Sequence, residues 1–231
     1  MLKVDLLILS AGYGKRLIPI SEYVPKPLIK IAGVPNLFRI IENLQNYVNH
    51  IFINTHHLHD QIYSVLTKKF PKINIIHEDN ILGTGGAIKN VIDKSDSDLL
   101  IVYNCDVSTD LDVIDLLDFH ISNKNDVSLA VQSRKSSRPI LFNTDMHFLG
   151  RKTLLTEGRE FGFCGIHVVS KVKLLNNPID EFSIIDFYCK IKDDIKITGF
   201  NIHHNFWIDI GTLRDLEYTE NLMQKKACQY V

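Results

Sequence analysis

The chain has 231 residues, of which 45% are hydrophobic and 23% are charged, a composition typical of a soluble globular protein. Its 26 basic and 27 acidic side chains leave a formal charge of -1. That balance argues against a broad nucleic-acid-binding surface, which normally needs a basic excess, although a local basic pocket for phosphate remains compatible with it. No apolar run is long enough to span a bilayer. We therefore expect a cytoplasmic protein with neither nucleic acid nor membrane as a partner.

The cysteines and the first residues support the same expectation. Cys105, Cys164, Cys189 and Cys228 lie far apart and form no CxxC pair, so reduced thiols are favoured over disulfides or a zinc site. The opening MLKVDLLILSAG is a short apolar run interrupted by an acidic residue. A buried first strand explains it better than a signal peptide does.

The first 132 residues alternate between two kinds of pattern. Residues 4–10 form a continuous apolar run that ends in glycines, as in a strand buried on both faces. After Pro35, apolar residues fall on one helical face: Leu37, Ile40, Ile41, Leu44 and Val48. Further strands are predicted at 50–54, 73–77, 99–103 and 127–132, and helices at about 59–69, after the glycines at 85–86, and at 111–122. Such alternation predicts a Rossmann-like α/β fold with a mostly parallel sheet flanked by helices.

The pattern changes after residue 132. Residues 133–170 are polar and glycine-containing, with one clear strand at 161–169, and we expect a small insertion of short strands beside the main sheet. A helix at 183–192, a strand near 195–200 and a closing helix from 212 follow. We expect one domain, 1–231, with parts at about 1–132, 133–170 and 171–231. No hexapeptide repeat is present, so no β-helix is expected.

The chemistry is concentrated in residues 10–28, SAGYGKRLIPISEYVPKPL. Gly12 and Gly14 allow a sharp turn whose backbone N–H groups can cradle anionic oxygens. Lys15 and Arg16 add positive charge, and Lys26 stands between two prolines that stiffen the backbone. A dinucleotide fingerprint does not fit, because a proline-bearing loop follows where a helix would have to begin. The loop therefore predicts a phosphate-binding site, with a solvated basic turn as the alternative.

Four ordered motifs resemble those of the sugar-phosphate nucleotidyltransferases. They are A-G-Y-G-K-R-L with P-K-P-L, then L-G-T-G-G-A at 82–87, N-C-D at 104–106 where the family usually has N-G-D, and W-I-D-I-G-T at 207–212. The resemblance covers nearly the whole chain and implies a GT-A-type fold. It also implies transfer of a nucleoside monophosphate from an NTP to a sugar 1-phosphate, with Mg²⁺ as cofactor and pyrophosphate released. The chain looks most like short uridylyltransferases of N-acetylmuramate 1-phosphate and guanylyltransferases of mannose or heptose 1-phosphate, which makes UTP or GTP the expected nucleotide.

The implied reaction is in-line attack by the sugar phosphate, which is already an anion near neutral pH because the second pKa of a phosphate monoester is about 6. It needs placed positive charge rather than a general base or a covalent nucleophile. We therefore expect Arg16, in the position that the resemblance gives it, and Lys26 to be catalytic. Asp106 is the third expected catalytic residue and acts with them by holding Mg²⁺. The resemblance places the nucleotide against Ala11, Gly12, Gly14, Lys15, Arg16, His77, Gly83, Thr84 and Asp106. Thr84 has an alternative role as a helix N-cap.

Two aspartates are the expected metal ligands. Asp106 follows an apolar strand at the sheet edge where ligands of open α/β folds bind, and Asp209 lies in the W-I-D-I-G-T segment. On the sugar side, the resemblance implies Asn104, Glu157, Gly165 and Asp209. The family's E-K-P motif, whose lysine binds the sugar phosphate, is absent. Its candidate substitutes are Lys152, Arg134 and Arg138, which could equally form a solvated charged turn.

Three alternatives stay open at this point. Transfer to phosphocholine would need an aromatic cage, for which the candidates are Tyr13, Tyr23, Tyr103 and Trp207. A catalytically inactive nucleotide-binding relative is the second alternative. Such relatives usually lose the charged catalytic residues, whereas this chain keeps Arg16, Lys26, Asp106 and Asp209. The third is a zinc site among the histidines at 56, 57, 59, 203 and 204, which no cysteine or acidic residue completes. Oligomeric state is open, and a homo-oligomer is compatible with the sequence.

Overall fold

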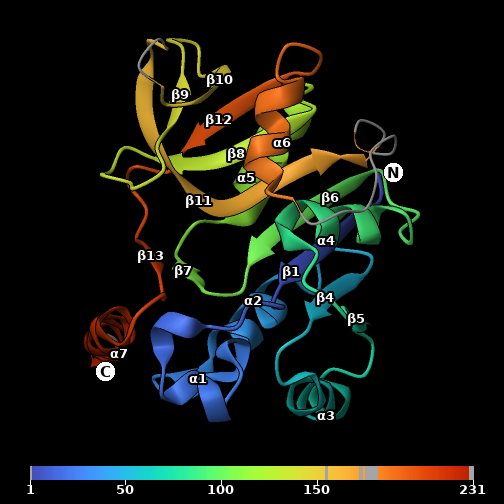
Figure 1. Ribbon diagram of the computed structural model, residues 1–231, viewed down its shortest axis with the longest axis vertical. Coiled ribbons are helices and arrows are strands. Elements are labelled where there is room, and N and C mark those ends of the chain that lie inside the picture. Colours follow the sequence, from blue (N-terminus) through green and yellow to red (C-terminus); the bar gives the residue numbers. More distant parts are fainter. Residues whose placement is uncertain (1, 154–155, 172–173, 175–181, 229–231) are drawn as a thin grey trace.

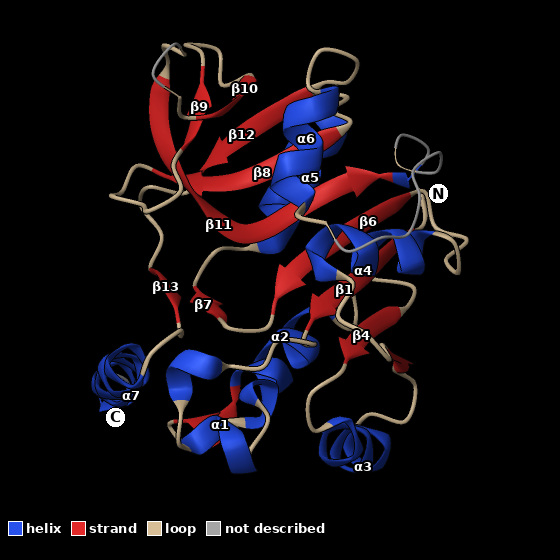
Figure 2. Ribbon diagram, in the orientation of Figure 1, coloured by secondary structure: helices blue, strands red, loops and turns tan. Residues whose placement is uncertain are grey.

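The computed structural model describes residues 2–153, 156–171, 174 and 182–228. Its main sheet consists of β1 (Val4–Leu9), β4 (Ile51–Thr55), β5 (Asn74–His77), β6 (Leu99–Asn104), β8 (Val127–Gln132), β9 (Ile140–Phe142), β10 (Phe148–Arg151), β11 (Arg159–Ser170) and β12 (Ile197–Asn201). The α-helices are α1 (Ile20–Tyr23), α2 (Asn36–Leu44), α3 (His59–Lys69), α4 (Gly83–Ile92), α5 (Val113–Ser122), α6 (Ile184–Ile191) and α7 (Leu213–Cys228). Figures 1 and 2 show the helices on both faces of the sheet.

The centre of the sheet is parallel, in the order β6-β1-β4-β5. At the carboxyl end of β1, Leu9 pairs with Asn54 of β4 on one side and with Asn104 of β6 on the other. The chain runs from β1 to β4 and β5 in one direction and then returns to β6 in the other. The carboxyl ends of β1, β4 and β6 therefore meet at a topological switch point, where open α/β sheets bind ligands.

Each face of the sheet has its own hydrophobic core, because successive strand residues point to opposite faces. On one face Leu6 and Ile8 pack with residues of α2, α3 and α5, while on the other face Leu7 packs with residues of α4 and α6. The apolar stripe predicted after Pro35 is confirmed: Leu37, Ile40, Ile41 and Leu44 are buried. This two-sided burial confirms the mostly parallel α/β sheet flanked by helices.

Residues 133–170 contain the expected short strands, β9 and β10, but β11 is longer than predicted. Its second half runs antiparallel between β6 and β8, with Ile166 opposite Tyr103. The register of β11 against β8 shifts between Phe163 and His167, which marks a bulge. Its first half pairs with β9. The region is therefore continuous with the sheet through β11, and a bridge between His147 and Thr198 of β12 joins it a second time. The three-part division at 132 and 170 stays a prediction.

Several short elements lack a sequence signal. They are the 3₁₀ helices Lys15–Leu17 and Lys26–Leu28, helix α1, the hairpin β2 (Lys30–Ile31) and β3 (Val34–Pro35), and the strand pair β7 (Val107–Thr109) and β13 (Trp207–Asp209). Cys105, Cys164 and Cys189 are free thiols as expected, and the side chain of Cys228 lies outside the described residues. Among the helices described, none has the length and apolar character to cross a membrane.

Candidate functional site

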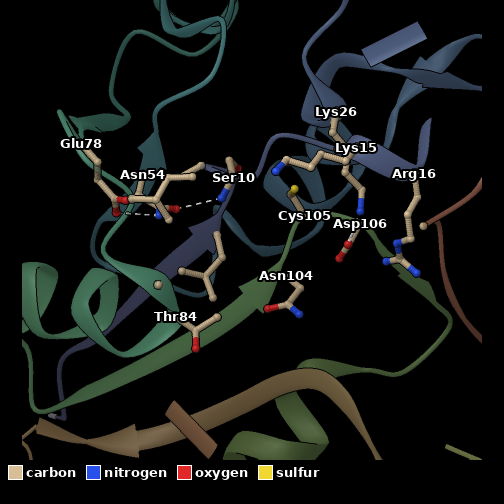
Figure 3. Close-up of a pocket in the computed structure, with 17 residues that line it drawn as sticks. Ser10, Lys15, Arg16, Lys26, Asn54, Glu78, Thr84, Asn104, Cys105 and Asp106 are labelled. Atoms are coloured by element: carbon tan, nitrogen blue, oxygen red, sulfur yellow. Dashed lines mark hydrogen bonds and ion pairs between the residues drawn. The ribbon is translucent and has the colours of Figure 1, made fainter. Parts of the chain in front are cut away.

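A cavity of about 340 Å³ opens at the carboxyl ends of β1, β4 and β6. Its lining combines backbone of the glycine loop with charged and amide side chains, shown in Figure 3. The lining residues are Leu9, Ser10, Ala11, Gly12, Gly14, Lys15, Arg16, Lys26, Asn54, Glu78, Ile81, Gly83, Thr84, Asn104, Cys105, Asp106 and Gly211. The three predicted catalytic residues, Arg16, Lys26 and Asp106, are thus brought together, along with every predicted nucleotide-binding residue except His77.

The glycine loop folds back on itself because Gly14 adopts a left-handed conformation, with φ of 66°. A Cβ on Gly14 would lie 3.2 Å from the Cβ of Ser21 and 3.4 Å from that of Lys26. The hydroxyl of Ser21 donates a hydrogen bond of 2.9 Å to the carbonyl of Gly14. This close packing sets the loop against the turn that carries Lys26, so both face one cavity.

Lys26 forms an ion pair with Asp106, and its side chain is only 14% exposed. Burial lowers the pKa of Lys26, but the charge of Asp106 and the hydrogen bond to it outweigh burial, so that the pKa is raised overall. The lysine is therefore a cation at every physiological pH.

Asp209 is brought beside Asp106 by the pairing of β13 with β7, in which Asp209 lies opposite Val107. Burial and then the charge of Asp106 raise the pKa of Asp209 to about 6. Its Oδ1 atom is buried and has no hydrogen-bond partner among the described residues, and its Oδ2 lies 3.9 Å from Nη2 of Arg16. Two neighbouring carboxylates, one with a buried oxygen that makes no hydrogen bond to the described residues, form a donor set that suits a cation.

The two aspartates fit a divalent metal. No group of three or more His, Cys, Asp or Glu side chains is placed to bind a metal within the described parts of the chain. Mg²⁺ does not require such a group, since it typically binds one or two carboxylates, substrate phosphates and water. Asp106 and Asp209 match that donor set, and zinc coordination by the histidines gains no support.

The residue two positions after Asp209, Gly211, has no room for a side chain. A Cβ at position 211 would lie 2.6 Å from Nη2 of Arg16. The guanidinium of Arg16 therefore packs directly over the backbone at Gly211, on the same side as Asp209. The W-I-D-I-G-T motif supplies both a carboxylate and the surface on which Arg16 rests.

The other end of the cavity is formed by the start of α4. Gly83 has a φ of 67°, and a Cβ on Gly85 would lie 1.9 Å from the ring of Phe182. The N-cap position is Leu82, and Oγ1 of Thr84 accepts a hydrogen bond of 2.9 Å from the backbone N–H of Ile184. The alternative role of Thr84 as an N-cap is therefore wrong, because the helix already includes it.

Glu78 is the main site residue that sequence reasoning missed. It is buried, its Oε1 accepts a hydrogen bond of 2.8 Å from Nδ2 of Asn54, and its Oε2 accepts one of 3.1 Å from the backbone N–H of Leu82. Oδ1 of Asn54 accepts in turn from the backbone N–H of Ser10, at 2.8 Å. The available signal was position: an acidic residue directly after β5, at the same edge of the sheet as Asp106.

Four predicted site residues are not part of the cavity lining: His77, Glu157, Gly165 and Asp209. Asp209 nevertheless lies beside Arg16, which does line the cavity. The ring of His77 packs against that of His59 with centroids 4.3 Å apart, and its Nε2 lies 3.7 Å from Oδ1 of Asp79. Glu157 is exposed and lies in the segment between β10 and β11.

On the expected sugar side, Asn104 lines the cavity and Gly165 lies against it. A Cβ on Gly165 would come within 2.7 Å of Nδ2 of Asn104. Of the candidate substitutes for the missing lysine, Lys152 pairs with Glu160, and the guanidinium of Arg134 stacks 3.9 Å from the ring centroid of Trp207.

The four aromatic residues that were candidates for a phosphocholine cage lie in different surroundings. Tyr103 is buried in the core, Tyr23 is exposed, the ring of Trp207 is covered by Arg134, and Tyr13 packs against two histidines. The fold does not bring these four rings together around a cation.

Comparisons with known proteins agree with this geometry. The family model described as nucleotidyl transferase matches residues 6–142. A mannose-1-phosphate guanylyltransferase of Mycobacterium tuberculosis is 34% identical over 55% of this chain and 36% of its own length. A D-glycero-alpha-D-manno-heptose 1-phosphate guanylyltransferase of Aneurinibacillus thermoaerophilus is 28% identical over 96% of this chain and 99% of its own.

A solved structure is also similar. HddC from Yersinia pseudotuberculosis, complexed with GMP-PN, is 27% identical with a TM-score of 0.78, covering 96% of this chain and 100% of that one. The chain spans between about a third and about half of the length of the curated relatives it matches first, which include bifunctional GlmU proteins of methanogens.

Proposed function

Because this chain belongs to the nucleotidyl transferase family, we propose that it transfers a nucleoside monophosphate from an NTP to a sugar 1-phosphate and releases pyrophosphate. The observation that carries the proposal is the convergence of Arg16, Lys26, Asp106 and Asp209 at the switch point of the sheet. Of these four residues, the two cations and Asp106 line the cavity, and the second carboxylate, Asp209, lies beside Arg16 at its edge. These are the charges that this reaction requires.

The chain's own residues act here by binding and orientation. The backbone of the glycine loop and Arg16 hold the triphosphate, and Lys26 lies between the α-phosphate and the incoming sugar phosphate. No side chain needs to take a proton from the nucleophile, since a phosphate monoester is already ionised near neutral pH. Cys105, the residue before Asp106, lines the cavity, but its thiol is unsuited to nucleophilic attack because burial raises its pKa to about 12. Mg²⁺ held by Asp106 and Asp209 would neutralise phosphate charge and favour departure of pyrophosphate.

GTP is the proposed nucleotide. A carboxylate accepts hydrogen bonds and donates none. Glu78 therefore suits the edge of guanine, which presents two neighbouring donors, N1–H and N2–H, better than that of uracil, which presents one donor between two acceptors. Its contacts with Asn54 and Leu82 leave further lone pairs on both oxygens. The similar HddC structure contains GMP-PN, and two similar relatives are guanylyltransferases.

By the same likeness, mannose or heptose 1-phosphate is the proposed acceptor. We propose that the acceptor is bound by Asn104, Glu157, Gly165 and Asp209. We also propose that Mg²⁺ is the cofactor. Cytoplasmic location and homo-oligomer formation stay predictions.

The test is pyrophosphate release from each of five NTPs with a panel of sugar 1-phosphates and phosphocholine, in Mg²⁺. We expect release with GTP and mannose or heptose 1-phosphate, and its loss in Asp106→Asn. Release only with phosphocholine would contradict the sugar acceptor. Binding of GTP without release from any acceptor would favour the catalytically inactive relative.

A further inference from the structure

Tyr13 stands between the two glycines of the phosphate loop and is held from outside by histidines that follow β4. Its hydroxyl lies 3.1 Å from Nε2 of His56, and the two rings meet edge to face, with centroids 5.4 Å apart and planes at 88°. His57 packs 5.5 Å from the same ring and is itself tied to the carbonyl of Ser21 at 3.0 Å. These contacts hold the tip of the loop in place, although the side chain of Tyr13 is 44% exposed to solvent.

The hydrogen bonds of His56 have a defined direction. Its Nδ1 lies 2.8 Å from the backbone carbonyl of Glu78. A carbonyl only accepts, so Nδ1 carries the proton, and in the neutral ring Nε2 then presents a lone pair to the hydroxyl of Tyr13. Tyr13 donates to His56, and His56 donates to Glu78.

A second chain of hydrogen bonds runs in parallel inside the cavity. The backbone N–H of Ser10 donates to Asn54, and Asn54 donates to the carboxylate of Glu78, as the dashed lines of Figure 3 show. Both chains begin on the phosphate loop, cross the carboxyl end of β4 and end at Glu78. The inner chain holds the first residue of the loop, and the outer chain holds its tip.

We propose that Tyr13 and His56 are positioning residues that fix the spacing between the phosphate loop and the nucleobase-binding segment at Glu78. Neither lines the cavity, so they act through the loop and not on the ligand. The base and the triphosphate of a nucleotide are covalently joined, and a protein that presents both subsites at the correct spacing loses less free energy to ordering on binding. This inference rests on the proposed function, since it requires one nucleotide to occupy both subsites.

The test compares a ligand that needs both subsites with one that needs only the phosphate loop. Binding of GTP and of inorganic tripolyphosphate, each with Mg²⁺, is measured by titration calorimetry for the wild type, Tyr13→Phe, His56→Ala and the double variant. Losing one net hydrogen bond should raise the Kd for GTP about threefold to tenfold in Tyr13→Phe, while the Kd for tripolyphosphate stays within about twofold. The double variant should bind GTP no more weakly than His56→Ala, because both changes break one chain.

Steady-state kinetics adds a second readout: the KM for GTP should rise in Tyr13→Phe with kcat little changed. Tyr218→Phe, an exposed tyrosine of α7, is the matched control and should leave both ligands unaffected. Equal weakening of GTP and tripolyphosphate, or effects of the two single variants that simply add, would overturn the inference and leave the proposed function standing. If the wild type binds no NTP at all, the proposed function fails and takes the inference with it.

Discussion

Lys26 reaches the cavity from a short 3₁₀ turn that begins after Pro25 and contains Pro27. In the structure its charge is directed at Asp106. A buried cation fixed in place before substrate arrives needs no rearrangement when charge develops in the transition state, which is the condition under which electrostatic stabilisation is largest. The two prolines that restrict the backbone on either side of Lys26 therefore hold its charge in position.

Lys26→Ala should lower kcat by about 100-fold or more while weakening GTP binding less than tenfold. The reason is that Arg16 and the loop backbone still hold the triphosphate, whereas the bridging charge is lost. Single-turnover rates and GTP titrations measure the two effects separately. Lys30→Ala, an exposed lysine of β2, is the control and should change neither. Equal losses in rate and affinity would refute a transition-state role.

Asp209, the second proposed metal ligand, lies where its negative charge is unfavourable. Its folded-state pKa of about 6 lies above the ordinary value of 3.8, so the folded state binds the proton more tightly than the unfolded state does. The stability that this contributes is present below about pH 4 and is lost as the pH rises through about 6. At pH 8 without metal, Asp209 is a carboxylate that faces Asp106.

Asp209→Asn should therefore raise the melting temperature of the metal-free protein at pH 8 and abolish turnover. Mg²⁺ should raise the melting temperature of the wild type and have a smaller effect on the variant, since ligands of the native state stabilise it by mass action. Thermal melts with and without Mg²⁺ at pH 8 measure both. A lower melting temperature for the metal-free variant would show that Asp209 is held by favourable contacts.

At the scale of elements, β11 connects the site to the part of the sheet beyond it. Gly165 lies in its bulge with a φ of 73°, and only a residue without a Cβ lets the strand pass so close to Asn104. The bulge thereby sets the position of a cavity-lining amide from a strand that runs antiparallel to β6.

Gly165→Ala should lower the free energy of unfolding by about 1–3 kcal/mol, through the left-handed backbone and the close approach together. Introducing the same change into an Asn104→Ala background isolates the contact with Asn104, because that background removes the atom 2.7 Å away. The backbone strain and the approach to Cγ2 of Val107, at 3.0 Å, remain. Urea unfolding of the four proteins measures the difference. An identical loss in both backgrounds would mean that the contact with Asn104 contributes nothing.

For the whole molecule, the sequence predicted what depends on local pattern. The stripe from Leu37 to Leu44 and the buried runs of β1 and β8 show their period within one element, and structure and prediction agree there. The pairing of β7 with β13 joins residues about 100 positions apart, and each strand has three residues, too few for a period. Local pattern therefore could not reveal that Asp209 meets Asp106. The W-I-D-I-G-T resemblance did.

The residues that line the other end of the cavity were harder to predict from the sequence for a related reason. Asn54 and Glu78 enter the cavity because the registers of β1, β4 and β5 align their carboxyl ends, and register is a property of the assembled sheet. His77 was expected to bind the nucleotide, but successive residues at a strand end point to opposite sides. Its neighbour Glu78 lines the cavity instead.

The protein also carries a stability feature that only the folded core reveals. His167 of β11 is fully buried, and neither of its ring nitrogens has a hydrogen-bond partner within the part of the chain that the structure describes. Burial lowers its pKa to about 3. Burial also lowers the pKa of His120 to about 4. The unfolded chain binds a proton at each histidine near the ordinary pKa of 6.5, so below that pH the unfolded state binds more protons and stability falls with falling pH.

Between pH 7.5 and pH 5 each of these histidines should cost about 2 kcal/mol of unfolding free energy, from the protonation that only the unfolded state accepts. His167→Leu should remove its share, so that the variant loses about 2 kcal/mol less than the wild type over this range. It should be no less stable at pH 7.5, because an apolar side chain removes the two unpaired ring nitrogens that His167 places beside Phe163 and Tyr188. Urea unfolding at the two pH values measures this, with the exposed His203→Gln as the control. If His167→Leu and the wild type lose the same stability on acidification, then His167 is protonated in the folded protein and the core around it admits water.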